Sequence, residues 1–445
     1  MKRYRAYKPT GTNWISSVPI TWDVKKIVHL FSQRKEKVSD RDFPPLSVTK
    51  NGILPQLDNA AKTDDGDNRK RVCVGDFVIN SRSDRKGSCG VSALEGSVSL
   101  INIVLHPRSQ LTGNYVHYLL RSQPFSEEFY RNGRGIVADL WTTRYSEMKT
   151  ILLPVPPREE QDQIVRYLDW QVSKINRLIA AKRKRIALIS ASKHAFASKL
   201  VTKGLDASCT MRYSGVNWLG DIPKHWQISK LRTILHPVSE KNRPDLPLLS
   251  VVREKGVIPR DVDDKESNHN YIPDDLSGYK VVRTHQFVIN KMKAWQGSYG
   301  IAPCDGIVSP AYFVFNIDFD NLEYFHHAIR SKVYVNFFAQ ASDGIRVGQW
   351  DLSIDKMKDI PFILPPSDEQ AAIVESIKKN NAQADTTISA LEKQIAVLQE
   401  LRTRLISDVV TGRVDVRGIE VPEFEMVRDT VEEQEEDAEE IMQET

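Results

Sequence analysis

The strings Pro156-Pro157-Arg158-Glu159-Glu160-Gln161 and Pro365-Pro366-Ser367-Asp368-Glu369-Gln370 open two long, similar stretches of the chain, which close near residues 206 and 415. Proline ends whatever element precedes it, and acidic residues in a first turn face the positive end of the helix dipole. Both strings therefore predict helix starts. Ser367, with Gln370 three residues later, also predicts a capping box.

Both stretches carry apolar residues at alternating steps of three and four, over 165–200 and 374–409, which is the spacing of a coiled-coil seam. Polar residues such as Lys182 interrupt the seams at different places, and both seams carry a base at one equivalent position, Lys193 or Arg402. Such breaks favour pairing of the two helices with each other inside one chain. The alternative is two separate helices on separate domains. Forty helical residues span about 60 Å, so a paired seam would form a rod.

The composition argues against several classes of protein. The length of 445 residues predicts two to three domains, and 40% of the residues are apolar. No run approaches the about 18 apolar residues of a membrane span, and Met1-Lys-Arg-Tyr-Arg lacks the apolar core of a secretory signal. The four cysteines form no Cys-x-x-Cys pair, so neither a zinc site nor a disulfide framework is indicated. We expect a cytoplasmic protein without a cofactor.

Charge is distributed unevenly along the chain. Residues 420–445 hold twelve acids and one base, so this stretch carries −11. Since the whole chain carries +4, the remaining residues carry +15, which favours nucleic acid as a partner. Residues 416–445 have few aromatics and dense like charge, so we expect an acidic, disordered tail there.

The residues outside the long helices also occur twice. Asn13-Trp14, Pro19 and Trp22 return as Asn217-Trp218, Pro223 and Trp226, all 204 residues later, which indicates a tandem duplication. The strand-like string Phe-Val-Ile-Asn at residues 77–80 returns at 287–290, each time before a basic loop that ends in Gly-Ser-x-Gly and predicts a tight turn. Stretches 114–130 and 322–338 each predict one amphipathic helix.

Each copy thus predicts a globe of mixed strands and helices followed by a long helix. We expect an α+β fold with two similar globular domains, at 1–155 and 209–364. Two long helices, at 156–208 and 365–415, would separate them and pack as an antiparallel coiled coil, with the acidic tail at 416–445. The duplication predicts a pseudo-twofold arrangement, whereas the order of the strands is not legible from the sequence.

The sequence offers little sign of a catalytic site. It has no Gly-x-x-x-x-Gly-Lys phosphate loop, no Gly-x-Ser-x-Gly elbow, and no Asn-Pro-Pro-Tyr or Asp-Pro-Pro-Tyr string of the kind with which amino-methyltransferases hold a flipped base. Asp84-Arg85-Lys86 has the Asp-x-Lys spacing of many nucleases, with Asp76 or one of three aspartates at 64, 65 and 67 as a second magnesium ligand. The second copy has no aspartate in this loop, so a basic DNA-contact loop is favoured.

Basic and aromatic residues on loops remain as candidates for DNA contact, because Arg and Lys reach phosphates and Arg pairs with guanine in the major groove. For each charge the alternative is a solvated surface, and for Trp141 and Trp350 core packing is favoured. The candidates are Arg82, Arg85, Lys86, Arg134 and Arg144 in the first copy, and Lys291, Lys293, Trp295, Arg346 and Gln349 in the second.

Residues 1 to about 415 resemble the specificity subunits of type I restriction-modification systems. The string Ile289-Asn-Lys-Met-Lys-Ala-Trp-Gln-Gly-Ser-Tyr-Gly-Ile, followed by Val308-Ser-Pro-Ala-Tyr, is similar to one of that family's target-recognition domains. The Pro-Pro-acid-Gln starts of both helices are typical of the family too. The first copy matches the string only loosely, and the acidic tail departs from the family pattern.

The resemblance implies a noncatalytic DNA reader with a split target, one half for each domain. It also implies partners: double-stranded DNA, two modification subunits that methylate adenine with S-adenosylmethionine, and restriction subunits that cleave DNA with ATP. The helices would hold the readers apart and dock the modification subunits, with half-sites about 10 bp apart between centres. The runner-up is a coiled-coil scaffold of two protein-binding modules without DNA, and the third interpretation is a nuclease built on Asp84 and Lys86.

Overall fold

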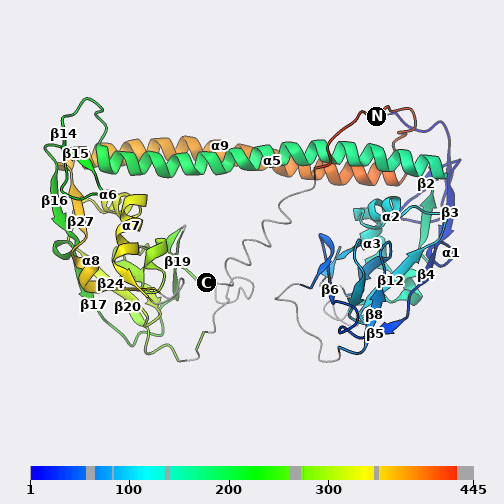
Figure 1. The fold of residues 1–445 in the computed structure, drawn as a ribbon, viewed down its shortest axis with the longest axis horizontal. Coiled ribbons are helices and arrows are strands. Elements are labelled where there is room, and N and C mark those ends of the chain that lie inside the picture. The colour runs from blue at the N-terminus through cyan, green and yellow to red at the C-terminus, as the bar shows by residue number, and fades with distance from the viewer. Residues whose placement is uncertain are drawn as a thin grey trace. The chain divides into compact units, whose positions relative to one another are not determined.

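Two compact units make up the structure, a computed structural model that describes residues 2–56, 66–82, 85–135, 141–253, 255–260, 272–273, 275–344 and 350–427. Unit 1 takes its residues from 1–183 and 392–444, and unit 2 from 184–391. The long helices α5 (Arg158–Lys203) and α9 (Ser367–Val410) each pass from one unit into the other (Figure 1). Each unit therefore combines a globe with the start of one long helix and the end of the other.

Unit 1 is built on an antiparallel sheet with the strand order β10-β9-β12-β4. Smaller pairings join β1 to β2, β3 to β13, β6 to β7, and β8 to both β11 and β5. Its elements are β1 (Tyr7–Pro9), β2 (Ser17–Pro19), β3 (Asp23–Lys26), α1 (Ile27–Leu30), β4 (Phe31–Gln33), β5 (Lys37–Val38), β6 (Leu46–Thr49), β7 (Gly52–Pro55), β8 (Arg69–Val72), β9 (Phe77–Asn80), β10 (Cys89–Val91), β11 (Gly96–Val98), β12 (Asn102–Pro107), α2 (Gly113–Leu120), α3 (Gln123–Arg131), α4 (Tyr145–Met148) and β13 (Leu152–Val155).

Unit 2 repeats this sheet with the order β22-β21-β24-β17, so the equivalent strands hold equivalent places. The smaller pairings return as β14 with β15, β16 with β27, β18 with β19 and β20 with β23. Its elements are β14 (Met211–Tyr213), β15 (Asp221–Pro223), β16 (Gln227–Lys230), η3 (Leu231–Thr233), β17 (Leu235–Val238), β18 (Leu249–Val252), β19 (Gly256–Pro259), β20 (Lys280–Val282), β21 (Phe287–Asn290), η4 (Ala294–Gln296), β22 (Tyr299–Ile301), β23 (Gly306–Val308), β24 (Tyr312–Ile317), α6 (Leu322–Ile329), α7 (Lys332–Gln340), β25 (Ser342–Asp343), β26 (Asp351–Leu352), α8 (Ile354–Lys358) and β27 (Pro361–Leu364).

The central strands bury both of their faces, which explains why they read as continuous apolar runs. Along β21, Phe287 and Ile289 enter a cluster that includes the ends of both long helices, while Val288 points into a second cluster. Successive residues of a strand face opposite sides, so one short string serves two cores. Burying each such side chain contributes about 1.5–3 kcal/mol.

Stretches 114–130 and 322–338, each expected as a single helix, are each two helices. Ser122, between α2 and α3, has extended backbone at φ −64° and ψ 146°, and Ser331, between α6 and α7, has φ −68° and ψ 154°. Pro124 in the first turn of α3 is suited to a helix start. The expectation missed these breaks because an apolar period continues across both serines.

The helix starts differ from the predicted capping box. The side-chain Nε2 of Gln370 donates to the carbonyl of Pro365 at 2.9 Å, and that of Gln161 donates to Pro156 at 3.0 Å. The side chain of each glutamine is thus hydrogen-bonded to the proline that precedes its helix. The predicted capping box, in which Ser367 and Gln370 would each bond the other's backbone, is wrong. Both helices end at a glycine in the left-handed region, Gly204 at φ +76° and Gly412 at φ +75°.

Polar residues join α5 and α9 within each unit. In unit 1, Arg402 Nη1 donates to Asn176 Oδ1 at 2.7 Å, and Lys182 Nζ donates to Gln394 Oε1 at 2.5 Å. In unit 2, Lys193 pairs with Asp385. The residue numbers fall on α9 as they rise on α5, so the two helices run in opposite directions. The bases that interrupt the seams therefore have partners on the facing helix.

Residues 416–427, which we name the C-terminal strap, are ordered and hydrogen-bonded to α5 in unit 1. The expectation of disorder is wrong for this stretch, because buried polar groups of α5 hold its backbone. Residues 428–445, the rest of the expected tail, lie outside the described residues. Within the part of the chain that the structure describes, no helix combines the length and apolar character needed to cross a membrane.

Candidate nucleic-acid interface

Arg82 and Arg134, two of the predicted contact residues, flank Thr142 in unit 1. Arg82 follows β9 and Arg134 follows α3, and each forms an antiparallel bridge with Thr142. The amide of Arg134 donates to the carbonyl of Thr142, and the amide of Thr142 donates back, both at 3.0 Å. Both arginines are exposed. Two cations far apart in the sequence are thereby fixed on one short ladder.

Tyr130, which the sequence analysis did not single out, organises this cluster. Its hydroxyl donates to the carbonyl of Arg82 at 2.9 Å, and Lys86 Nζ lies 5.1 Å from the centre of its ring. Trp141 Nε1 donates to the carbonyl of Tyr130 at 2.9 Å. Trp141 is half-buried and this bond ties its loop to α3, so core packing of Trp141 stays a prediction. The cation–π contact holds Lys86 near the loop surface.

The remaining two candidates of unit 1 lie on the same loops. Arg85 is exposed in the turn after β9, which closes at Gly87 with φ +82°, as predicted for the Gly-Ser-x-Gly string. Arg144 is exposed and immediately precedes α4. Its neighbour Thr143 donates its amide to the carbonyl of Ser81 at 2.9 Å. The five candidate cations of unit 1 therefore lie on loops that backbone hydrogen bonds join to one another.

One carboxylate accompanies these cations. Glu147 Oε1 lies 3.9 Å from Arg134 Nε, whose side chain is 84% exposed. The hydrogen bond from Ser146 Oγ, together with the lesser attraction of Arg134, lowers the pKa of Glu147. Glu147 is therefore ionised at neutral pH and orients Arg134 weakly, because a pair this exposed contributes little energy.

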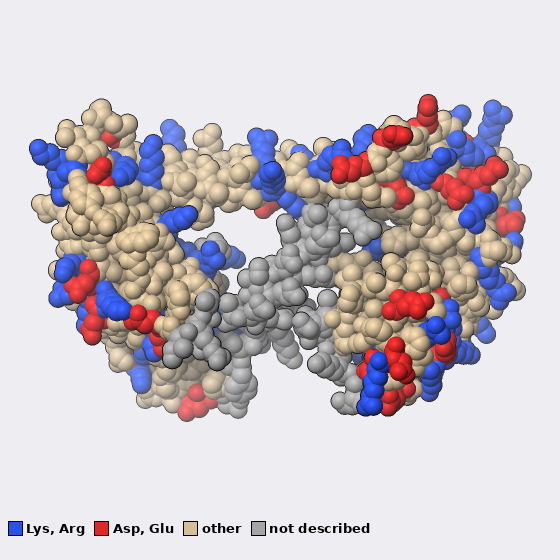
Figure 2. Space-filling model, in the orientation of Figure 1, with Lys and Arg blue, Asp and Glu red and all other residues tan. Residues whose placement is uncertain are grey.

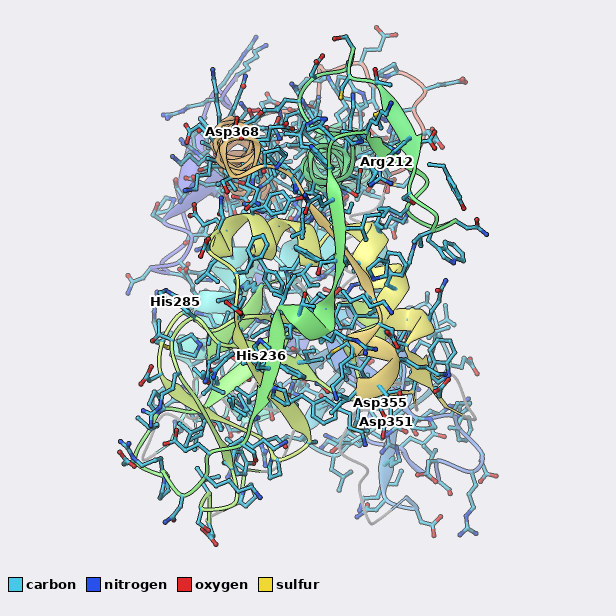
Figure 3. All side chains as sticks on the ribbon, turned by 90° about the vertical axis from the view of Figure 1, so that its left-hand side faces the viewer. Arg212, His236, His285, Asp351, Asp355 and Asp368 are labelled. Atoms are coloured by element: carbon cyan, nitrogen blue, oxygen red, sulfur yellow. The ribbon has the colours of Figure 1, made fainter. Side chains whose placement is uncertain are left out.

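The equivalent loop of unit 2 carries a different set of charges. Lys291 Nζ lies 2.6 Å from Asp351 Oδ2, and Lys291 accepts a backbone hydrogen bond from Leu352. The rings of Trp295 and Trp350 pack with their centres 5.3 Å apart. Figure 3, which views unit 2, labels Asp351 on the same side of the unit as Asp355. Lys293 precedes η4 and is half-buried.

Aspartates replace neutral or basic residues at two repeat-equivalent places. Asp343 and Asp351 occur 209 residues after Arg134 and Thr142. Asp343 in turn holds Lys356 Nζ at 2.7 Å. The loop of unit 2 is therefore charge-paired where that of unit 1 is basic. Aligning the two copies at this offset would have found both aspartates from the sequence.

Arg346 and Gln349 lie outside the described residues, so the structure does not place these two candidates. On the face that Figure 2 shows, basic and acidic side chains are interspersed over both units. The net charge alone therefore does not locate an interface. The loops that carry Arg82, Arg134 and Thr142, and the equivalent loops of unit 2, are a better guide to the interface than the net charge is.

The nuclease interpretation loses one of its proposed ligands. The buried carboxylate of Asp76 accepts from Arg34 Nε at 2.7 Å and from the Cys73 amide at 2.9 Å, and it lies 3.1 Å from His106 Nδ1. Asp64, Asp65 and Asp84 are outside the described residues. Among those described, no group of three His, Cys, Asp or Glu side chains is arranged to hold a metal ion.

Two named proteins resemble this chain in sequence. No protein-family model matches the chain. It is 22% identical over 438 residues to a protein named as the MjaX type I restriction enzyme specificity subunit of Methanocaldococcus jannaschii, covering 91% of this chain and 96% of the relative. It is 23% identical over 290 residues to the MjaVIII type I specificity subunit of that organism, covering 61% of this chain and 64% of the relative.

A solved structure supports the fold. A chain from a study of complex assembly and conformational transition in the type I R-M system superposes with a TM-score of 0.51 at 14% identity, covering 89% of this chain and 99% of that one. Both have mixed helix and strand content. The sequence likeness, which extends over nine tenths of the chain, confirms the resemblance: the chain is similar to type I restriction enzyme specificity subunits.

Proposed function

We propose that the chain is the sequence-specific DNA-binding specificity subunit of a type I restriction-modification complex. One observation carries the proposal: the two units share the same strand order in their main sheet, but their loops differ. In unit 1 the loop presents Arg82 and Arg134, and in unit 2 it presents Lys291 held by Asp351. Two readers of one architecture with different donors and acceptors suit a target of two unlike halves.

The readers in this proposal are residues 1–155 and 209–364, related by a pseudo-twofold duplication. Residues 156–208 and 365–415 form an antiparallel coiled coil that spaces them, and residues 416–445 are an appended acidic segment. The cross-helix bonds Arg402–Asn176 and Lys193–Asp385 support the pairing. A spacer of fixed length gives a bipartite target with a short nonspecific gap.

The DNA contacts in this proposal are the loop residues of both readers. Cations reach the phosphates, and arginine with a free face pairs with guanine. Lys291, already balanced by Asp351, is better placed to orient that carboxylate toward an amino group of a base, since Asp accepts from cytosine N4. The contact set is Arg82, Arg85, Lys86, Arg134, Arg144, Lys291, Lys293, Trp295, Arg346 and Gln349.

Partner subunits supply the chemistry in this proposal, and this chain is noncatalytic. Two modification subunits dock on the helices, where Val397 and Leu188 expose 63% and 62% of their surface. Restriction subunits complete the complex, which acts on double-stranded DNA in the cytoplasm.

DNA binding and methylation mapping test the proposal. The chain with its modification subunits should bind duplex DNA with an affinity that falls steeply with salt. Expression in a host without other methyltransferases should add adenine methylation at one bipartite sequence. Assembly with partners but no DNA binding would favour the scaffold alternative, and magnesium-dependent cleavage by the chain alone would favour the nuclease.

A further inference from the structure

Each unit has a β-hairpin next to the basic loop that follows its central strand. In unit 1 this hairpin is formed by β6 and β7, with Lys50 and Asn51 in its turn. In unit 2 it is formed by β18 and β19, with residues 253–255 in its turn. We name the loops 81–88 and 291–298, which carry candidate contact residues, the contact loops. No residue of either hairpin turn was among the contacts predicted from the sequence.

Two arginines that the duplication makes equivalent, Arg121 and Arg330, hold the hairpin turns in place. Arg121 follows α2, and its Nη2 donates to the carbonyl of Lys50. Arg330 follows α6, and it donates from Nη2 to the carbonyl of Arg253 and from Nη1 to the carbonyl of Tyr299, both at 2.6 Å. Since Tyr299 immediately follows the contact loop of unit 2, this guanidinium joins the hairpin turn to the loop.

The hairpin turn of unit 1 has the same neighbours. Arg121 lines a cavity of about 10 Å³ together with Asn80, Gly87 and Tyr130. Asn80 directly precedes the contact loop and Gly87 belongs to it, while the hydroxyl of Tyr130 donates to the carbonyl of Arg82 within it. The side chain that holds the turn at Lys50 therefore also touches the start, the end and the support of the contact loop.

Two pairs of glycines let each hairpin lie against the strand that follows the contact loop. A Cβ on Gly90 of β10 would lie 3.1 Å from the Cα of Gly52 in the hairpin. A Cβ on Gly300 of β22 would likewise lie 3.1 Å from the Cα of Gly256. Such an approach leaves no room for a side chain at these places. The hairpin therefore keeps a fixed place beside the contact loop in both units.

Both hairpin turns present a lysine and a net charge of +1. The turn of unit 1 reads Lys50-Asn51, and that of unit 2, one residue longer, reads Arg253-Glu254-Lys255. Lys50 and Lys255 are exposed, and neither forms an ion pair with a carboxylate in the part of the chain that the structure describes. Lysine donates hydrogen bonds and accepts none, and its ammonium is a compact charge on a flexible stem, so an anion such as a phosphate suits it.

We propose that the two hairpin turns are a second set of DNA contacts, which bind phosphates beside the bases that the contact loops read. Lys50 in unit 1 and Lys255 in unit 2 supply the charge, while Arg121 and Arg330 are positioning residues that hold the turns. A contact to phosphate fixes the place of a reader on the duplex and carries no sequence information. The inference rests on the proposed function, because it takes duplex DNA as the partner.

Salt-dependent DNA binding by the chain with its modification subunits tests the inference. Lys50→Ala and Lys255→Ala should each reduce the salt slope of log K by about one and weaken binding roughly threefold to tenfold near physiological salt. Methylation mapping should return the same bipartite sequence for both variants as for the unchanged chain, which also shows that the variants fold.

Lys224→Ala is the matched control. Lys224 is an exposed lysine of unit 2 that follows β15, a strand beside the end of α5 (Figure 1). Lys203, at that helix end, donates to the carbonyl of Asp221 in the strand. Because this place is part of neither the hairpin nor the contact loop, the salt slope should stay unchanged. A slope that falls as much as that of Lys255→Ala would show that the loss is not specific to the hairpin turn, and would count against the inference.

Arg330→Lys separates positioning from charge. Lysine keeps the positive charge but lacks the planar fork that bonds two carbonyls at once. The variant should weaken DNA binding, and combining it with Lys255→Ala should weaken binding no further than Lys255→Ala alone, because Arg330 acts through the turn. Additive losses would contradict the positioning role, since they would give Arg330 an effect of its own.

Unchanged salt slopes in both lysine variants would overturn the inference. A changed methylation target would overturn it too, because the turns would then read bases rather than bind phosphates. Absence of any DNA binding by the unchanged chain with its modification subunits would instead contradict the proposed function. The two failures are therefore distinguishable in one set of titrations.

Discussion

The hydroxyl of Tyr115 donates a 3.3 Å hydrogen bond to the carbonyl of Val410, a residue 295 positions later in the chain. In unit 2, Tyr324 donates at 3.4 Å to the carbonyl of Val201. The duplication makes Tyr115 equivalent to Tyr324 and Val201 equivalent to Val410. Each tyrosine therefore contacts the valine of the other copy. Each globe is therefore bonded to the end of a long helix, and in both units that helix comes from the other copy.

Removing either hydroxyl should weaken its own unit. Tyr115→Phe and Tyr324→Phe each leave a buried carbonyl with one partner fewer, so each should lower the free energy of unfolding by about 1 kcal/mol. Denaturant unfolding, followed by hydrogen exchange at Val410 and Val201, measures both effects. A loss of protection in the unit that keeps its tyrosine would contradict the assignment of each bond to one unit.

Residue 2 and residue 415 should tolerate being joined by a linker. The amide of Asp415 donates to the carbonyl of Lys2 at 2.9 Å, so a short linker can connect them without moving either unit. A permuted chain with that linker, opened after Ser208 and lacking the strap, should keep its circular dichroism spectrum and melt within a few degrees of a linear chain that ends at Asp415. Opening inside α9 instead breaks a helix and is the control expected to unfold.

The ladder of unit 1 should contribute electrostatically to DNA binding. Arg82→Ala and Arg134→Ala should each weaken binding and reduce the salt slope of log K by about one. Arg404→Ala, an exposed cation of α9 that pairs with Asp408, is the matched control and should leave the slope unchanged. Equal slopes for all three variants would remove the ladder from the interface.

The helix pair should set the length of the gap in the target. Deleting residues 184–190 and 387–393 together removes one heptad from each helix and keeps their register, shortening the pair by about 10 Å, or about 3 bp of DNA. Methylation mapping should show a shorter gap or no methylation. An unchanged gap would contradict the spacer role.

Acid should destabilise unit 2 through His326. Burial, reinforced by neighbouring His327, lowers the pKa of His326 to about 4. Because an unfolded histidine binds its proton near pH 6.5, stability should fall as the pH drops from about 6.5 toward 4. The loss should be about 1–3 kcal/mol, since the ring keeps some exposure. Denaturant unfolding of His326→Gln across this range should show a smaller decline, and an equal decline would assign the effect to other groups.

The strands and the two long helices were legible in the sequence for a physical reason. Phe77–Asn80 and Phe287–Asn290 are buried on both faces, and such strands need unbroken apolar strings. The helices were legible because one apolar period continues for dozens of residues. The facing partners, such as Asn176 for Arg402, were not predicted, because the seams alone do not set the register of one helix against the other.

Long-range tertiary contacts could not be predicted from the sequence. Nothing in the local sequence shows that Tyr130 supports Arg82, or that Asp351 holds Lys291, because these pairs come from loops far apart in the chain. The strap was missed because its composition predicts disorder, whereas its backbone is held by side chains of α5. Capping was mispredicted at Gln370 because the motif does not reveal that a proline carbonyl competes for the amide.

The second globe lies in the sequence between the end of α5 and the start of α9, with Gly204 on one side and Pro365 on the other. A recombination event with crossovers at these two points would exchange that globe and leave both helices, and hence Arg402–Asn176 and Lys193–Asp385, as they were. The contacts of the globe with the helices, such as the bond of Trp226 to Glu369 and the packing of Phe287 and Ile289 against the helix ends, would have to be inherited with the incoming segment. A host lineage could then acquire a new recognition sequence for one half of its proposed target in a single step, while the helix pair stays as it was.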